Sequence, residues 1–404
     1  MNIAKDQPVK QTSAGFMSDL GRVLRENIRD YGMFIALFII WGVFAALTDG
    51  LFLSSRNLSN LLNQFGYIAV LGIGMTLIIV IRHIDLSVGF LAGFMGAVAA
   101  IAMTFWGLPV YLVVPAVLIL GALLGLLPGL MVAQLGIPSF VATLAGLLIY
   151  RGAILVVTEG SGTIIIHDDI FNALGNGFIP NLLGDLWPGK HLLTLALGAI
   201  AVVWFIYNEL KGRRNKLAYG FEVLPRNIFI LKLVFAALLV AALTWVLANY
   251  NGLSWTVVIL LIVLAIYQFV TTQTVLGRHI YAVGGNPEAA ELSGVNVKRI
   301  TLLVFSQMGA LAALSGLLFA SRLQSATTTA GTLFELDAIA AAYVGGVSAA
   351  GGVGRVTGAV VGALVMASLT SGMNLMGLGI SYQYIIRGIV LALAVIFDVT
   401  TRKR

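Results

Sequence analysis

Long runs of apolar residues, separated by short polar segments, dominate the chain from residue 31 onward. A helix needs about 20 apolar residues to cross the hydrocarbon core of a bilayer. Such runs predict ten transmembrane helices, over residues 31–48, 66–81, 87–106, 110–135, 139–157, 191–208, 229–248, 253–271, 300–320 and 382–398. Two further runs, 336–350 and 356–376, are rich in Gly and Ala, and the first can be a full span or a re-entrant half-helix. We therefore predict an all-α, polytopic membrane protein with about 12 transmembrane helices.

The polar segments predict a simple domain organisation. Residues 1–30 form a tail in which scattered apolar positions suit an amphipathic interfacial helix, although a loose tail fits equally well. Residues 51–65 have the pattern of a short amphipathic helix on the outer membrane face. Residues 31–404 then form a single transmembrane domain.

The composition agrees with this interpretation. Only 10% of the residues are charged, compared with roughly 25% in a soluble domain. A water-soluble enzyme could not cover its surface with so few polar groups, and a disordered chain would not be 59% hydrophobic. The chain has no cysteine, which excludes disulfides, Cys-bound metals and thiol nucleophiles.

The net charge of +7 raises the question of nucleic-acid binding, and the positions of the charges answer it. In a twelve-helix arrangement with the N-terminus inside, most of the 24 Lys and Arg fall on the cytoplasmic side. Only Arg56, Lys190 and Arg322 fall outside, and Arg151 and Arg387 lie within helices. This is a positive-inside distribution with both termini in the cytoplasm, and because the basic residues are spread over loops, no nucleic-acid partner is predicted.

Two segments of the chain have a similar pattern of glycines and acidic residues. Gly121 and Gly125 form a small-xxx-small pattern, as do Gly358 and Gly362. An acidic helix start precedes each pattern, at Asp85 and at Asp337. The predicted directions of these helices are opposite, so the shared pattern indicates an inverted repeat, although the unequal spacings leave chance similarity open.

The loop 277–299 carries the clearest local signals. Asn286 suits an N-cap, Pro287 the first helical position and Gly294 the position after a helix C-terminus. These residues predict a two-turn helix lying across a cytoplasmic loop, where it can fit into a groove on a partner protein.

This loop resembles a known family. Together with Glu335–Ala341, Gly345–Gly352 and Ile84–Gly89, it is similar to the permease subunit of bacterial monosaccharide ABC importers of the ribose, xylose, arabinose and galactose group. Arg82-His83 stands where many relatives have Gly-Gly, which puts a shared role of that turn in doubt. The stretch 190–250 is longer than in ribose-type permeases by two helices, which resembles the xylose or multiple-monosaccharide branch.

The resemblance implies partners and a site. Two permease chains form the pathway, a periplasmic sugar-binding protein delivers the sugar, and an ATP-binding subunit holds ATP and Mg²⁺, so this chain binds no cofactor and is not an enzyme. The ATPase-coupling residues would be Gly277, Arg278, Tyr281, Gly284, Gly285, Asn286, Pro287, Glu288, Ala289, Ala290, Leu292 and Gly294.

Polar residues inside or at the ends of apolar helices are the candidates for the substrate pathway, because burying them in a membrane is costly. They are Asn63, Gln64, Asp85, Ser87, Arg151, Glu335, Asp337, Tyr343 and Asn374. Helix capping explains the acidic starts equally well, and snorkelling towards the interface explains Arg151 and Arg387. No metal site is predicted, because His167, Asp168 and Asp169 lack a spaced partner histidine.

Two other functions remain open at this stage. An ion-coupled secondary transporter of a small polar solute would need ionisable groups near the bilayer midplane, and this chain has few. An intramembrane enzyme would need a catalytic group at one membrane face, and His83 with Asp85 is the only close pair.

Overall fold

The fold is described from a computed structural model, which covers residues 28–182, 187–221 and 223–402. The tail helix predicted over residues 1–30 lies outside the described residues, except for residues 28–30, which form the start of α2. The elements, in chain order, are α2 (Ile28–Leu47), η1 (Leu51–Leu53), α3 (Ser55–Val80), α4 (Val88–Thr104), α5 (Val110–Ala133), α6 (Ser139–Val157), β1 (Ile164–Ile165), α7 (Asp169–Asn176), α8 (Leu192–Ala218), α9 (Arg226–Ala248), α10 (Trp255–Gln273), α11 (Val275–Gly285), α12 (Pro287–Leu292), α13 (Val297–Leu323), β2 (Ser325–Ala326), α14 (Phe334–Val344), α15 (Val356–Leu375) and α16 (Ile380–Arg402).

The predicted all-α membrane architecture is confirmed. Within the described residues, nine helices are long and apolar enough to cross a membrane, and two shorter apolar helices span Gly32–Leu47 and Val88–Thr104. The strands β1 and β2 have two residues each and pair antiparallel, with Ile164 opposite Ala326.

The chain divides into two compact units. One contains Ala196–Thr244, and therefore most of α8 and α9. Within it, Gly198 packs against Thr244, and Lys232 pairs with Glu209 at 2.7 Å. These helices lie within the stretch 190–250, which the resemblance predicts to be longer than in ribose-type permeases.

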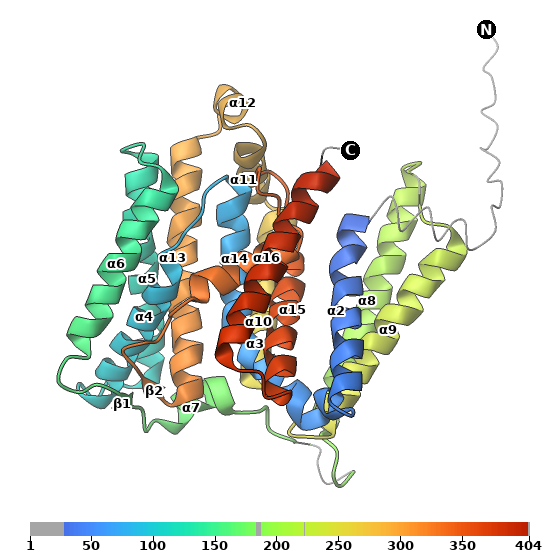
Figure 1. Cartoon of the computed structure of the whole chain (residues 1–404). Helices are drawn as coiled ribbons and strands as arrows, with labels where there is room; N and C mark the ends of the chain where they lie inside the picture. The colour runs from blue at the N-terminus through green and yellow to red at the C-terminus, as the bar shows by residue number, and fades with distance from the viewer. Residues whose placement is uncertain (1–27, 183–186, 222, 403–404) are drawn as a thin grey trace. The chain divides into compact units, whose positions relative to one another are not determined.

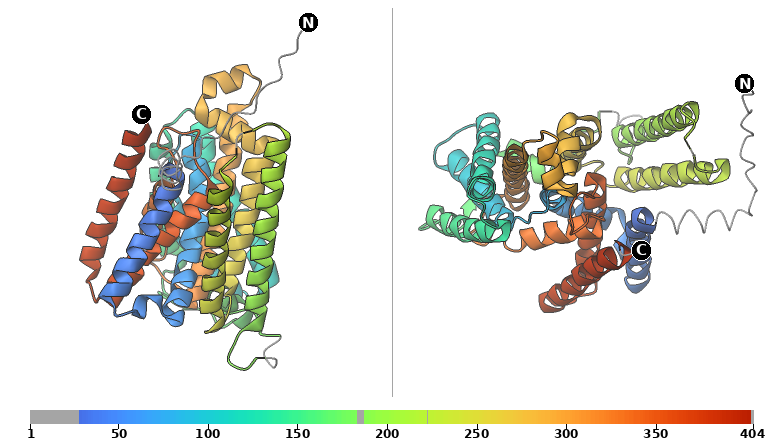
Figure 2. Two further views of the ribbon diagram at one scale, coloured as in Figure 1. Left: turned by 90° about the vertical axis from the view of Figure 1, so that its right-hand side faces the viewer. Right: turned by 90° about the horizontal axis from the view of Figure 1, so that it is seen from above.

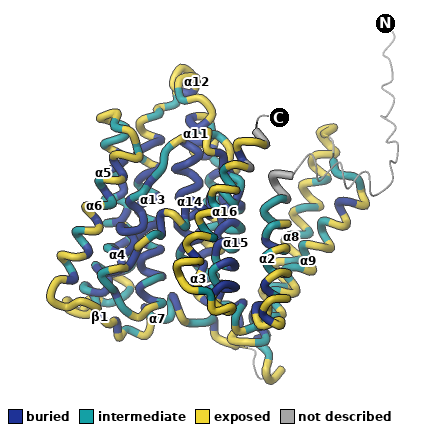
Figure 3. The backbone as a smooth tube through the Cα atoms, viewed as in Figure 1, coloured by how far each residue is buried: buried dark blue, intermediate teal, exposed yellow. Residues whose placement is uncertain are grey.

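The other unit, which contains Met33–Leu195 and Trp245–Arg404, is built around buried helices. α3, α13 and α15 are largely buried, whereas much of α5, α6 and α16 is exposed (Figure 3). Apolar side chains such as Ile119, Leu148 and Ile389 are exposed on these outer helices, as expected of surfaces that face lipid.

Glycines bring the buried helices into close contact. Gly121 and Gly125 of α5 pack against the backbone of Gly309 in α13. In the second segment with this pattern, Gly358 and Gly362 of α15 pack against Gly345 and the C-terminal part of α14. Both small-residue patterns therefore serve helix packing, and the inverted repeat stays a prediction.

The predicted division of residues 51–81 into an outer amphipathic helix and a separate span is wrong. After the short η1, one continuous helix runs from Ser55 to Val80, with Ser54 as its N-cap. The polar residues Ser59 and Asn63 lie on its buried side. Their polarity suggested an interfacial helix, but they face protein and not the membrane surface.

The choice between a full span and a half-helix at 336–350 is settled by α14. It contains 11 residues, which gives a length of about 16 Å, half of the hydrocarbon thickness. Figure 1 shows α14 lying obliquely within the bundle. It follows an irregular segment in which Leu333 has a left-handed backbone, with φ of 65°. α14 is therefore a half-helix, and the described residues contain eleven apolar helices and this half-helix in place of the predicted count of about twelve spans.

The two ends of this bundle differ. α11 and α12 project from one end, where α16 also terminates, and α7 with the β1–β2 pair lies at the other (Figures 1 and 2). We refer to these as the α12 end and the α7 end.

Candidate functional site

The α11–α12 segment forms one candidate site, and local caps define it. Thr274 Oγ1 accepts a hydrogen bond from Gly277 N at the start of α11. Asn286 Oδ1 accepts one from Ala289 N at 3.0 Å, with Pro287 at the first helical position. Gly294 ends α12 with φ of 84°. The predicted capped helix is confirmed, but residues 277–285 form the helix α11 and not a loop.

The predicted coupling residues separate into an inner and an outer set. Gly277, Gly284 and Ala290 are buried and Tyr281 is half-buried, so these residues hold the segment on the bundle. The exposed members are Arg278, Gly285, Asn286, Glu288, Ala289, Leu292 and Gly294, with Pro287 partly exposed. Leu292 is 91% exposed, an apolar side chain at the tip of the bundle and available to a partner.

Three connections attach α11 to the bundle. Tyr281 Oη donates to Gly354 O at 2.7 Å, and partial burial raises the pKa of this phenol, an effect that Arg355 counteracts. Gly284 packs against the carbonyl of Val80, at the end of α3. The Arg82 guanidinium bonds to the carbonyls of Gly284 and Gly285.

The loop between α14 and α15 joins this segment to α16. Asp398 Oδ2 accepts hydrogen bonds from Ser348 Oγ at 3.3 Å and from Ala349 N at 3.2 Å. The same loop contains Gly354, the acceptor of the Tyr281 hydroxyl. The end of α16 and α11 are therefore tied to one loop.

A second candidate site is a cavity of about 100 Å³ inside the bundle. Residues of α3, α14, α15 and α16 line it. They are Gln64, Phe65, Tyr67, Ile68, Asp337, Ala363, Met366, Ala367, Thr370 and Arg387. Its wall thus combines an apolar surface with a small number of polar groups, as ligand sites usually do.

An ion pair forms the polar part of this cavity. Arg387 Nη1 lies 3.1 Å from Asp337 Oδ1, and the guanidinium also donates to Thr370 Oγ1 from Nη2 at 2.9 Å. Both charged side chains are 22% exposed. The pair leaves the cavity neutral overall, while the carboxylate can accept hydrogen bonds and the guanidinium can donate them.

Tyr67, which lines the cavity, belongs to a cluster of three aromatic rings. Tyr67 contacts Phe334 at a centroid distance of 5.1 Å and Phe319 at 5.2 Å, and these two phenylalanines contact each other at 4.9 Å. The triad fixes the start of α14 against α3 and α13.

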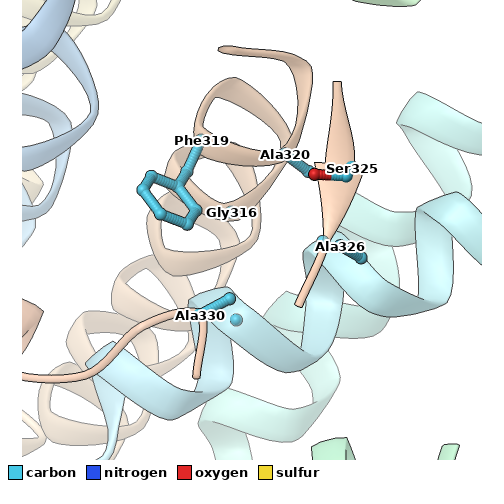
Figure 4. A pocket seen from close by; sticks show the side chains of 8 residues that line it. Gly316, Phe319, Ala320, Ser325, Ala326 and Ala330 are labelled. Atoms are coloured by element: carbon cyan, nitrogen blue, oxygen red, sulfur yellow. The ribbon is translucent and has the colours of Figure 1, made fainter. Parts of the chain in front are cut away.

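A second depression, beside Phe319, is only a packing feature. Small residues of α4, α13 and the β2 region line it, including Gly316, Ala326 and Ala330 (Figure 4). It has no volume for a water molecule, so it is not a ligand site.

Of the predicted pathway residues, the structure brings Gln64 and Asp337 together in the cavity. Asn63, next to Gln64, is buried elsewhere, and its Oδ1 has no hydrogen-bond partner among the described residues. Asn374 is exposed and accepts a hydrogen bond from Gln383 at 2.7 Å. Tyr343 is partly buried and does not line the cavity.

The remaining candidates lie around α4. Ser87 donates to Asp85 Oδ1 from its backbone N at 2.9 Å and from its hydroxyl at 2.6 Å, so Asp85 orders the turn before α4. Glu335 is buried against Gly89, with no described partner for its Oε2. Arg151 is exposed and lies 5.6 Å above the Phe90 ring.

Sequence reasoning missed part of the cavity wall. Arg387 was recognisable as a charge within an apolar helix, but Tyr67 and Thr370 carry no such signal. A tyrosine or threonine in a membrane helix is common, and only the packing of four helices reveals its role.

Asp168, beside His167, forms the N-cap of α7. Asp168 Oδ1 accepts a hydrogen bond from Phe171 N at 2.8 Å and caps α7. Within the described ranges, no group of three His, Asp or Glu side chains could hold a metal.

Comparisons with known proteins identify the family to which the chain is similar. The family model described as "Branched-chain amino acid transport system / permease component" matches residues 57–395. The xylose transport system permease protein XylH of Escherichia coli K12 is 39% identical over 378 residues, which cover 94% of this chain and 93% of that protein. The ribose import permease protein RbsC of the same strain is 35% identical over 366 residues, covering 90% and 92%. The Haemophilus influenzae RbsC is 34% identical over 382 residues, covering 94% of each chain. No solved structure matches the chain.

Proposed function

The chain belongs to this family of transport-system permease components, in its sugar-importing branch, and we propose that it moves a pentose or hexose into the cell. It is a multi-pass inner-membrane protein and a permease subunit of a monosaccharide ABC importer. The sugar passes unchanged, and a separate ATP-binding subunit, which holds ATP and Mg²⁺, supplies the energy. An ion-coupled transporter is not favoured, because the relatives are import permeases of this class.

The orientation follows from charge. The α12 end carries the basic starts and ends of helices, including Lys298, Arg299 and Arg402, and we assign it to the cytoplasm with both termini. The α7 end then faces the periplasm, where a sugar-binding protein would deliver the substrate. A second copy of the chain would complete the pathway.

The observation that supports a sugar-binding site is the cavity lined by Asp337, Arg387 and Thr370. Sugars are neutral polyols that need donors, acceptors and an apolar or aromatic face, and this cavity offers all three. Its volume of about 100 Å³ is smaller than that of typical ligand pockets, roughly 300 Å³ or more. Passage of a sugar would therefore require this cavity to widen during transport.

The α11–α12 segment is the docking site that we propose for the ATPase. Its inner residues fix it to the bundle, and Glu288 and Leu292 are exposed. When α12 lies in a groove on the ATPase, movement of the ATPase would displace α11 and α12. This displacement would act on α3 through the contact of Gly284 with Val80, and on α16 through the loop that bonds to Asp398.

Reconstitution tests the proposal. The chain, its ATPase and its binding protein are placed in proteoliposomes, and uptake of labelled xylose, ribose and leucine is measured with and without ATP. We expect ATP-dependent uptake of a sugar that vanadate blocks. Uptake of leucine alone, or sugar uptake that persists without the ATPase, would contradict it.

The orientation has its own test because the chain has no cysteine. Leu292→Cys at the α12 end and Ile170→Cys at the α7 end place one exposed thiol on each side. In intact spheroplasts, a membrane-impermeant maleimide should label the Ile170 variant and spare the Leu292 variant. The reverse pattern would invert the assignment.

A further inference from the structure

Arg82 has an unusual backbone. It follows α3, where His83 N donates to Ile78 O at 3.0 Å and Arg82 N donates to Ile79 O at 2.9 Å. These two hydrogen bonds form the Schellman motif at the end of a helix. The residue at the position of Arg82 in this motif is usually glycine, because its backbone is left-handed. Arg82 has a φ of 66°, a conformation that disfavours residues with a Cβ.

The side chain of Arg82 provides contacts that glycine could not. Its Nε donates to Gly284 O at 2.6 Å, and its Nη2 donates to Gly285 O. These are the last two carbonyls of α11, where the helix dipole favours a cation. The guanidinium therefore caps α11 from another helix, 202 residues away in the sequence.

The backbone segments around Arg82 are in close contact with one another. Gly352 N donates to Val80 O at 2.8 Å, and Gly284 has no room for a Cβ beside the same carbonyl. Gly351, with φ of 79°, leaves the space that the Arg82 stem occupies. Three segments thus meet at Arg82: the end of α3, the end of α11 and the loop before α15.

The two helices that Arg82 joins have distinct surroundings. α12 begins two residues after Gly285, which has the second bonded carbonyl, and exposes Leu292. α3 continues into the bundle and contributes Gln64 and Tyr67 to the cavity. We propose that Arg82 is a positioning residue that clamps the docking segment to α3, so that displacement of α12 by the ATPase moves the cavity wall. This inference rests on the proposed function.

Arg82→Gly is the decisive variant, because glycine suits the left-handed backbone and the fold should be retained. A nitroxide on Leu292→Cys, in the full chain in nanodiscs, reports the motion of α12. We expect Arg82→Gly to give a more mobile spectrum and, in the complete reconstituted importer, at least fivefold less sugar imported per ATP hydrolysed. Thermal stability should be equal to or above that of the parent chain. Arg82→Lys, which keeps one donor group, should recover part of both signals.

Arg214→Ala is the control, since Arg214 is an exposed arginine of α8 at which removal of a charge should change neither readout. The clamp is refuted if Arg82→Gly leaves the nitroxide spectrum and the transport ratio at the levels of the parent chain. If the parent complex imports no sugar, the proposed function fails, and the nitroxide spectrum alone still decides whether Arg82 holds α12.

Discussion

Arg387 of α16 donates from Nη1 to both carboxylate oxygens of Asp337 in α14, at 3.1 and 3.3 Å. The same guanidinium reaches Thr370 of α15, from Nε at 3.2 Å and from Nη2 at 2.9 Å. One side chain therefore links three of the helices that enclose the cavity. Few ion pairs lie within the membrane part of a protein unless they have a structural or transport role.

The ion pair predicts opposite effects of single and double substitutions on stability. Asp337→Ala leaves the Arg387 cation without its carboxylate and should lower the free energy of unfolding by about 1–3 kcal/mol. The double variant Asp337→Leu/Arg387→Leu replaces the pair by apolar groups and should recover much of that loss. Unfolding in mixed detergent micelles measures both effects.

Sugar uptake should separate from stability in these variants. Because the charged donor and acceptor of the cavity are absent from the double leucine variant, we expect its uptake to stay below a tenth of the parent value. Normal uptake by a stable double variant would show that the pair holds helices together without contacting the sugar.

Two adjacent glycines should respond differently to alanine. A Cβ on Gly284 would collide with the Val80 carbonyl, whereas a Cβ on Gly285 has nothing within 4 Å. We expect Gly284→Ala to destabilise the protein by about 1–3 kcal/mol and Gly285→Ala to leave stability unchanged. Melting temperatures in detergent check this, and equal temperatures for the two variants would contradict the packing at the end of α11.

Docking of the ATPase should depend on the exposed tip of α12. Leu292→Asp places a charge on an apolar side chain that is 91% exposed, so the isolated chain should fold normally. Co-purification with the ATPase should fall at least tenfold, because docking would then remove an unpaired carboxylate from water. Leu182→Asp, at another exposed leucine (76%) far along the chain, is the matched control.

The close contact of α5 with α13 predicts a strong position effect for a Gly-to-Ala change. A Cβ on Gly309 has no room beside the Gly121 carbonyl, while Gly152 of α6 has open space. Gly309→Ala should cost about 1–3 kcal/mol through overpacking. Gly152→Ala should be neutral or gain up to about 1 kcal/mol of helix propensity. The two changes have the same chemistry, so a similar loss in both would argue against glycine-mediated packing.

His83 predicts a loss of stability in acid. Burial lowers its pKa below the ordinary value of 6.5, and its ring lies 5.9 Å from that of Phe305. As the pH falls through 6.5, the unfolded chain takes up a proton that the folded chain does not, so the free energy of unfolding decreases. The slope reaches at most about 1.4 kcal/mol per pH unit.

His83→Asn should flatten the stability curve between neutral and mildly acidic pH, as measured by unfolding in buffered detergent. His167→Asn, at an exposed histidine, should keep the slope of the parent chain. An unchanged slope in His83→Asn would show that other groups cause the acid sensitivity.

The sequence predicted those features that depend on neighbouring residues. Asn286, Pro287 and Gly294 specify the start and end of α12 because capping acts within a few residues. The apolar runs predicted the membrane spans because each span is recognised from its own consecutive residues. Polarity misled at Ser59 and Asn63, since composition does not reveal whether a polar side chain faces water or the interior of the protein.

The cavity was harder to predict because it requires contacts between distant segments. Gln64 and Asp337 are 273 positions apart, and only the tertiary arrangement brings them together with Arg387. The acidic helix start at Asp85 looked equivalent to the one at Asp337, but its carboxylate bonds to Ser87 in its own turn. Sequence alone could not separate the two.

The half-length of α14 has a consequence for biogenesis. Eleven residues are too few for the insertion machinery to recognise as a span of about 20. Most of its contacts are with α3, made early, and α15, made late in synthesis. We therefore expect α14 to enter the membrane together with the nascent α15, so that the interior of the transporter is completed only after the ribosome has nearly finished the chain.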